Sequence, residues 1–512
     1  MVSHRLQFFR NKYTLILLLG LVLRLIAITT RPMWYDEAFS VLFSSTGPRG
    51  MISGTLGSDL TAGSAEEHPL GYYVLLWGWM KLFGASVLAI RSLSVLFGVG
   101  IVALSYFLAK LFFDEKTGQL AAFLVAISPF QIHYAQEVRM YVQLSLLLMG
   151  CAFSLYKAIN TIDDKNSWRW WFLFSLLAAG SQYTHNLAAI YLVPLALITV
   201  LTRKSKAIRN VILAGIGAML VYSPWMIHLP DQFTKLQTSY WISKPGILQI
   251  FNSLLIFVTN LPLPEEWLYL GLSLTLFILF FACWQTYKTY RRKAIGYRRG
   301  LLMVYLTFSP PTVLFLVSQW QPIFVERVLL TSGVFFLIWM AWVLTSTEMP
   351  RLLKTITTAL LFIGASMGIF QNTTYRGFPY GPFDQMGEAL SSVVSTGEVI
   401  VHSNKLTMLP SFYYHPDLPH EYITDPPGSG SDTLGIPTQE SLGLVASPSI
   451  EEAVGEATRV WFIIFPKAIE EYQVLGEDTH PHLGWLDTHY QLKGTEEWGS
   501  ILLYIYELKP DK

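Results

Sequence analysis

Acidic, basic and imidazole side chains stand at a few positions of an otherwise apolar chain, and their types could support chemistry. The candidates are Asp36, Glu37, Glu67, His68, Glu137, Arg139, Tyr183, His185 and Arg327. A carboxylate within hydrogen-bond reach of a hydroxyl can take its proton. A guanidinium is always charged and binds phosphate oxygens in bidentate fashion. Glu66, Glu67 and His68 offer ligands of the kind that hold divalent cations.

Each of these residues also has a structural interpretation. An Asp-Glu pair after a first helix is more often part of a solvated loop than a catalytic pair. Glu137 and Arg139 could form ion pairs that anchor helix ends, and His185 could hydrogen-bond to a carbonyl group. Three adjacent residues rarely surround one metal ion, so a solvated loop is the favoured interpretation of positions 66–68. Residue types alone leave both interpretations open.

The composition indicates where these residues must be positioned. Of the 512 residues 52% are hydrophobic and only 14% are charged, whereas a soluble domain carries about 25% charged residues. The excess apolar surface must face lipid. A net charge of +1 argues against a nucleic-acid partner. Cys151 and Cys283 both lie in apolar stretches and indicate neither disulfides nor a metal cluster.

Hydropathy predicts a polytopic α-helical membrane protein with about eleven transmembrane helices, each needing about 20 apolar residues. The predicted spans are 13–30, 87–113, 118–133, 138–158, 168–185, 187–202, 210–229, 267–287, 300–319, 328–347 and 353–371. Basic segments without acids at 1–12, 203–209 and 288–299 all fall in the cytoplasm if the N-terminus is cytoplasmic. The candidate residues then gather at the external side.

Two further regions lie outside this membrane part. The apolar run 70–84 is too short to span but rich in Tyr and Trp, which predicts an interfacial helix within a long external loop, 31–86. Residues 247–262 could form a second such element. Residues 371–512 hold 20 acidic and 7 basic residues. Apolar runs at 397–402, 459–465 and 501–507 alternate there with helix-like segments at 449–456 and 466–475. We therefore expect a transmembrane domain, 1–371, and a small extracytoplasmic α/β domain, 372–512.

Five blocks of sequence resemble the dolichyl-phosphate-mannose-protein mannosyltransferase-like family, which includes aminoarabinose transferase-like enzymes. The first runs from Arg31 through Asp36 and Glu37 to Ser40, and the second joins His68-Pro69-Leu70-Gly71-Tyr72-Tyr73 to Ala89-Ile90-Arg91-Ser92-Leu93-Ser94. The others are Ser128-Pro129 with 134–141, Tyr183-Thr184-His185, and 324–330. The resemblance covers about residues 10–345. One departure is His68-Pro69-Leu70, where a double proline is common.

The resemblance implies a GT-C fold and transfer of a sugar from a polyprenyl monophosphate with inversion at the anomeric carbon. It identifies Asp36 as the catalytic base, supported by Glu37. Arg139 and Arg327 are expected to stabilise the donor phosphate, and His185 to donate to the phosphate or the sugar. Glu137, Tyr183 and His68 are expected to bind the sugar or to support the site. Some relatives bind a divalent cation, and for this chain that question stays open, with Glu67 and His68 as candidate ligands.

Other functions remain open at this point. A flippase or transporter needs polar residues at the bilayer midplane and paired broken helices, whereas the charges here stand at span ends. A non-catalytic subunit of an envelope glycan assembly complex and an enzyme that transfers a whole oligosaccharide are further alternatives. The sequence names neither the sugar nor the acceptor, which could be protein, lipid or polysaccharide. We expect a multi-pass protein of a bacterial plasma membrane, with a cytoplasmic N-terminus and an external tail.

Overall fold

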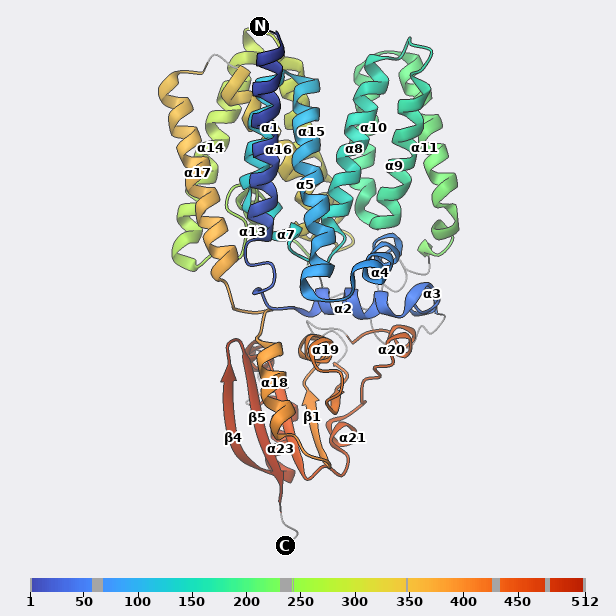
Figure 1. The fold of residues 1–512 in the computed structure, drawn as a ribbon, viewed down its shortest axis with the longest axis vertical. Helices are drawn as coiled ribbons and strands as arrows, with labels where there is room; N and C mark the ends of the chain where they lie inside the picture. Colours follow the sequence, from blue (N-terminus) through green and yellow to red (C-terminus); the bar gives the residue numbers. More distant parts are fainter. Residues whose placement is uncertain are drawn as a thin grey trace.

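A computed structural model describes residues 2–57, 68–230, 242, 244–346, 349–425, 433–474 and 479–509. Long helices run side by side in one part of the molecule, and a β-sheet lies beyond one end of them (Figure 1). Short helices lie between the two parts. The N-terminus and the sheet are at opposite ends of the helical part. Glu67, a candidate metal ligand, lies outside the described residues.

The helical part confirms the membrane-protein fold class. Its helices are α1 (Val2–Leu25), α5 (Val87–Phe112), α6 (Glu115–Ile127), α8 (Tyr141–Asn160), α9 (Trp168–Thr184), α10 (Ala189–Leu201), α11 (Ser205–Met226), α14 (Glu265–Arg291), α15 (Tyr297–Val317), α16 (Leu330–Ser346) and α17 (Arg351–Thr374). Among the described residues, seven helices are long and apolar enough to cross a membrane, and each coincides with a predicted span. Helices α1, α6, α9 and α10 overlap the other four predicted spans, and the total of eleven stays a prediction.

One helix forms the centre of this bundle. The segment Glu326–Thr345 comprises the 3₁₀ turn η2 (Glu326–Leu329) and most of α16. In its most apolar stretch of 18 residues, 94% is buried, whereas the corresponding stretches of α11 and α14 are only 28% buried. Trp339 and Trp342 of α16 are fully buried. The outer helices instead expose large apolar side chains such as Leu220 and Phe280. An apolar exterior of this kind is what a lipid environment requires.

Short helices cover the end of the bundle that faces the sheet. Helices α2 (Tyr35–Ser45), α3 (Gly47–Leu56) and α4 (Gly71–Phe83) lie there (Figure 1), whereas α7 (Pro129–Ala135) and α13 (Ile247–Ile256) pack within the bundle end. Helix α4 occupies the run predicted as an interfacial helix, and Trp79 ties it to α5 by donating from Nε1 to the Ala89 carbonyl at 2.8 Å. Helices α2 and α3 were not predicted, because the apolar content of 35–56 is too discontinuous for a span. A further 3₁₀ turn, η1 (Asn186–Ala188), joins α9 to α10.

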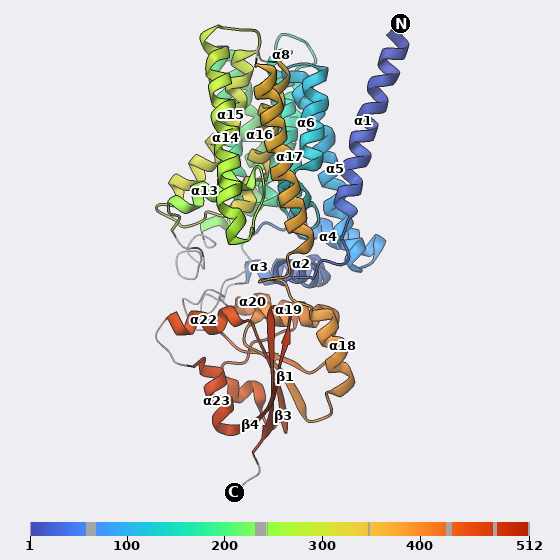
Figure 2. The same cartoon turned by 90° about the vertical axis from the view of Figure 1, so that its left-hand side faces the viewer.

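The C-terminal region contains a five-stranded sheet in the order β2-β1-β3-β5-β4. Its strands are β1 (Glu398–His402), β2 (His420–Tyr422), β3 (Arg459–Ile464), β4 (Tyr490–Trp498) and β5 (Ile501–Leu508). Strand β1 pairs in parallel with β2 and β3, placing Val401 opposite Phe462, whereas β5 pairs antiparallel with β3 and β4. Helix α18 (Phe383–Val393) covers one face, and α22 (Pro466–Val474) and α23 (Pro481–His489) cover the other (Figure 2).

Two helices of this region pack against the short helices at the bundle end. Helix α19 (Lys405–Tyr414) contacts α2, and α20 (Ile436–Leu442) contacts α3, while α21 (Ile450–Val454) stays with the sheet. Thr438 and Ser441 donate hydrogen bonds to the carbonyls of Gly54 and Gly50, each at 2.8 Å. Helix α2 is therefore held between the bundle and the sheet region. The division of the chain into domains at residue 371 stays a prediction.

Candidate active site

Helix α2 begins directly before the two acidic residues of the first block. Asp36 and Glu37 lie in its first turn, where the helix dipole favours negative charge. Both carboxylates are buried, Glu37 completely and Asp36 to 8% exposure. Burial of two neighbouring carboxylates is costly unless cations compensate it. The cations that do so differ for the two residues and give them different roles.

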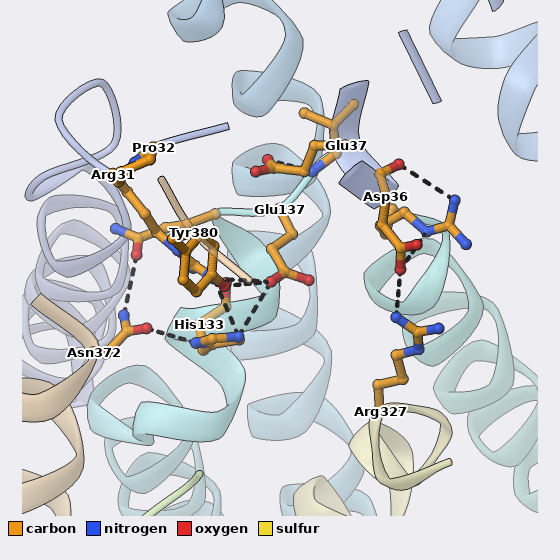
Figure 3. Close-up of polar contacts among 12 residues, drawn as sticks. Arg31, Pro32, Asp36, Glu37, His133, Glu137, Arg327, Asn372 and Tyr380 are labelled. Atoms are coloured by element: carbon orange, nitrogen blue, oxygen red, sulfur yellow. Dashed lines mark hydrogen bonds and ion pairs between the residues drawn. The ribbon is translucent and has the colours of Figure 1, made fainter. Parts of the chain in front are cut away.

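The Asp36 carboxylate contacts two arginines from distant parts of the chain. Its Oδ2 atom accepts a hydrogen bond from Nη1 of Arg327, which stands in η2, and lies 3.6 Å from Nε of Arg139 (Figure 3). Arg139 also donates to Ser40 Oγ at 3.2 Å and to the Asp36 carbonyl at 3.4 Å. The Arg327 guanidinium lies 5.1 Å from the centre of the Tyr141 ring, a cation–π contact. Two guanidinium groups therefore converge on one carboxylate oxygen.

The two guanidinium groups that meet at Asp36 are of the kind that binds an anion. Burial alone would raise the pKa of the Asp36 carboxyl, but Arg139 and Arg327 outweigh burial and lower that pKa below its ordinary value. Asp36 is therefore ionised at neutral pH. The Asp36 Oδ2 atom is shared by two guanidinium groups, so a phosphate could replace the carboxylate as the partner of either arginine.

The Glu37 carboxylate is bound to a different arginine. Arg91 donates from Nε to Oε1 at 2.9 Å and from Nη2 to Oε2 at 2.7 Å. Arg91 further donates to the carbonyls of Ile28, Arg31 and Pro32 at 2.6 to 3.2 Å. The backbone N–H of Val138 also donates to Glu37 Oε1, at 3.0 Å. The pair Glu37–Arg91 therefore fixes the chain between α1 and α2 against α5.

Glu137 belongs to a third group, and its carboxylate lies below Glu37 in Figure 3. Its Oε1 atom accepts from Arg31 Nη2 at 2.8 Å and from Tyr380 at 3.3 Å, and lies 3.2 Å from His133 Nε2. His133 Nδ1 lies 2.6 Å from Asn372 Oδ1. Burial raises the pKa of the Glu137 carboxyl, but His133 and Arg31 lower that pKa by a larger amount, so the net shift is downward. Glu137 pairs with Arg31 rather than with Arg139.

The histidines of the second and fourth blocks meet in space. The rings of His68 and His185 lie 4.7 Å apart, and the His185 ring lies 5.8 Å from that of Tyr141, the residue beneath Arg327. The backbone N–H of Leu187 donates to His185 Nδ1 at 3.1 Å. Because Nδ1 accepts, a neutral His185 carries its proton on Nε2 and can donate there.

The remaining predicted residues have other placements. The Tyr183 hydroxyl donates to the Val221 carbonyl at 2.9 Å and its ring packs on Tyr222, so the structure does not bring its phenol to the arginines. Glu67 lies outside the described residues. Among the residues that are described, no group of three or more His, Cys, Asp or Glu side chains is placed to hold a metal ion.

Sequence reasoning missed the residues that support this site, namely Arg31, Arg91, His133, Asn372 and Tyr380. For Arg91 a signal was present, because a charge within the predicted span 87–113 is costly and needs a buried partner. Tyr380 has no such signal, because it enters the site from the segment between α17 and the sheet. Its contact with Arg31 depends on the tertiary arrangement.

Comparisons with known proteins identify the family and the fold. Residues 67–228 match the family model described as dolichyl-phosphate-mannose-protein mannosyltransferase. The family resemblance is confirmed. The chain has the GT-C fold that this resemblance implies. No curated protein sequence matches the chain.

Solved structures match nearly the whole chain. ArnT from Cupriavidus metallidurans in the apo state is 10% identical over 96% of this chain and 97% of its own, with a TM-score of 0.63. The same protein bound to undecaprenyl phosphate is 9% identical with the same coverage and a TM-score of 0.62. The Archaeoglobus fulgidus oligosaccharyltransferase complex with Zn and sulfate is 12% identical over 96% of this chain and 73% of its own, with a TM-score of 0.53. At these identities the likeness shows the fold.

Proposed function

We propose that this protein is a membrane glycosyltransferase that transfers a sugar from a polyprenyl-phosphate carrier to an acceptor hydroxyl, with inversion and with Asp36 as general base. The observation that carries the proposal is the single Asp36 carboxylate between Arg139 and Arg327 at the bundle end. The family match and the fold support the proposal. So does the structure of ArnT, a protein of the same fold, bound to undecaprenyl phosphate.

Donor binding is assigned to the two arginines. The carrier's phosphate is the leaving group and already bears charge, so stabilising its oxygens matters more than protonating them. Arg139 and Arg327 supply fixed positive charge, and the Nε2–H of His185 adds a donor close to Tyr141. His68 packs on the His185 ring and supports it. The isoprenoid chain stays in the bilayer, since its removal costs about 0.8 kcal/mol per CH₂.

Donor binding also activates the base, because the two arginines exchange Asp36 for the donor phosphate as their partner. When phosphate draws the guanidinium groups of Arg139 and Arg327 away from Asp36, the carboxylate loses the charges that lower its pKa and becomes a stronger base. Asp36 then takes the proton of the acceptor hydroxyl while its oxygen attacks the anomeric carbon, and the carbon–phosphate oxygen bond breaks on the opposite face. A single displacement of this kind inverts the configuration and needs no covalent intermediate.

We assign Glu37 and Glu137 to holding neighbouring residues in place rather than to contact with the substrate. Glu37 is fully engaged by Arg91 and the Val138 N–H, so we assign it to holding α2 in place rather than to proton transfer. Glu137 holds Arg31, His133 and Tyr380 together. The reaction is assigned to the external face of a bacterial plasma membrane. The positive-inside rule places the basic segments 1–12, 203–209 and 288–299 in the cytoplasm, which puts this end of the bundle on the external side.

Arg327→Gln tests the assignment of the donor phosphate. The protein in lipid nanodiscs is offered a panel of radiolabelled polyprenyl-phosphate sugars, and loss of sugar from the lipid is measured. We expect the native protein to consume one donor and the variant to lose donor affinity and rate together. Arg298→Gln, an exposed arginine that contacts only Tyr297 among the described residues, is the control. Donor binding without any consumption by the native protein would favour a carrier or a non-catalytic subunit.

A further inference from the structure

One buried aromatic residue of the candidate active site, Tyr141, has no role in the mechanism above. It is the first residue of α8 and is only 2% exposed. The centre of its ring lies 5.1 Å from Cζ of Arg327 and 5.8 Å from the centre of the His185 ring. Its phenol group also interacts with the side chain of Arg139. Tyr141 therefore contacts all three groups to which the donor phosphate is assigned.

Hydrogen bonds fix the Arg327 guanidinium less firmly than that of Arg91. Arg327 donates from Nη1 to Asp36, but its Nε is a buried donor without a hydrogen-bond partner among the described residues. Arg91 instead uses Nε and both Nη atoms on Glu37 and three carbonyls. Further support for Arg327 comes from the Tyr141 ring, because the negative face of an aromatic ring attracts a cation.

The Tyr141 ring has a fixed position of its own. The Tyr134 ring of α7 meets it at 6.0 Å and 76°, and Tyr134 in turn meets the Phe130 ring at 5.3 Å and 89°. On another side, His185 lies between Tyr141 and His68. Edge-to-face ring pairs of this kind are favourable. The ring is thus held between α7 and the α9–α10 connection, without any need for Asp36.

This support matters more when a phosphate is bound than in the free protein. In the mechanism above, the phosphate takes the place of Asp36 as the partner of Arg327, so the carboxylate no longer holds the guanidinium. A long side chain loses rotamer entropy when a ligand fixes it, and this loss weakens binding. A guanidinium that already rests on a ring loses less, so the ring is expected to strengthen phosphate binding.

We propose that Tyr141 is a positioning residue, whose ring keeps Arg327 and His185 directed at one donor phosphate after Arg327 has left Asp36. The inference rests on the proposed function, because it takes a lipid phosphate as the ligand of these groups. The negative face of the ring is the essential feature, and the hydroxyl group contributes less. The role therefore depends on the electronic character of residue 141 as well as on its size.

The test measures binding of radiolabelled farnesyl monophosphate to the protein in nanodiscs by equilibrium dialysis, with farnesol as the probe that lacks the phosphate. Tyr141→Leu removes the ring, and Tyr141→Phe keeps it. Phenylalanine analogues fluorinated at two and at four ring positions are also placed at residue 141, because fluorine withdraws the negative charge of the face with little change in shape. The matched control is Tyr106→Leu, because Tyr106 of α5 is a buried tyrosine with the Lys110 ammonium 5.4 Å from its ring centre.

We expect the native protein and Tyr106→Leu to bind farnesyl phosphate equally well, and better than farnesol. Tyr141→Leu should weaken phosphate binding by about two- to thirtyfold, the range of a cation–π contact, and Tyr141→Phe should weaken it less. Affinity should then fall stepwise with fluorination, a trend that a purely structural role of the ring does not produce. Farnesol binding should not change in any of these proteins.

Two other results would separate the inference from the proposed function. If Arg327→Gln weakens farnesyl phosphate binding while the fluorinated proteins bind as tightly as Tyr141→Phe, the role of the Tyr141 ring is refuted and the phosphate site stands. If the native protein binds farnesyl phosphate no better than farnesol, the assignment of the donor phosphate fails, and the proposed function fails with it.

Discussion

Replacement of Arg91 by lysine should destabilise the protein strongly, although the charge is kept. All five N–H donors of the Arg91 guanidinium are used, on the two Glu37 carboxylate oxygens and on the carbonyls of Ile28, Arg31 and Pro32. An ammonium group has three donors, so at least two of these five acceptors lose the bond from residue 91. Glu37 Oε1 keeps the Val138 N–H, so at least one acceptor is left unsatisfied, at about 1–3 kcal/mol for each.

The measurement is reversible unfolding in mixed micelles, followed by tryptophan fluorescence, with Arg298→Lys as the control for an exposed arginine. Arg91→Met, which leaves the Glu37 carboxylate buried without its cation, should cost about 3–5 kcal/mol or more. The double variant Arg91→Met/Glu37→Met should recover part of that loss, because no buried charge then remains. If Arg91→Lys unfolds within about 0.5 kcal/mol of the native protein, the account of how α2 is fixed is wrong.

Three further outcomes follow from the site and its supports. Because Arg139 and Arg327 lower the Asp36 pKa in the free protein and donor phosphate withdraws them, the acidic limb of kcat should lie at higher pH than that of kcat/KM. Coincident acidic limbs in the two pH profiles would contradict that exchange. Tyr380→Phe removes the phenol hydroxyl bonded to Arg31 and Glu137, and should lower stability by about 1–3 kcal/mol in the same unfolding assay; an unchanged unfolding midpoint would show that the hydroxyl is not needed. Gly368→Ala would place a methyl group against the Thr259 carbonyl, and should cost about 1–3 kcal/mol, whereas Gly215→Ala, at an open position on α11, should be neutral.

Much of the fold could be predicted because hydropathy depends on local composition. Each predicted span contains a helix, and the Tyr- and Trp-rich run 70–84 contains α4. Strands β1, β3 and β5 are apolar runs and were found, whereas β4 is largely exposed and polar and β2 has only three residues. Neither of these two strands carries the apolar signal that a single sequence offers.

The site could be predicted only in part. Asp36 was identified from the family resemblance. Arg139 and Arg327 were identified because a guanidinium suits a phosphate and both stand at the predicted membrane boundary, and the structure brings these three together. The different roles of Asp36 and Glu37 were not visible, because they follow from which arginine each carboxylate meets after folding. Tyr183 shows the opposite error. It stands two residues before His185, yet it is on α9 and turns toward α11, whereas His185 follows the end of that helix.

The most direct test of the central claim compares the native protein with Asp36→Asn on the polyprenyl-phosphate sugar that the native protein consumes. Asparagine keeps the size of the side chain and removes its basicity. The account predicts that donor binding persists while transfer to extracted cell-envelope acceptors slows by about 10²–10⁴-fold, the usual contribution of a general base. Equal transfer rates for the two proteins would contradict the assignment of Asp36 and with it the proposed mechanism.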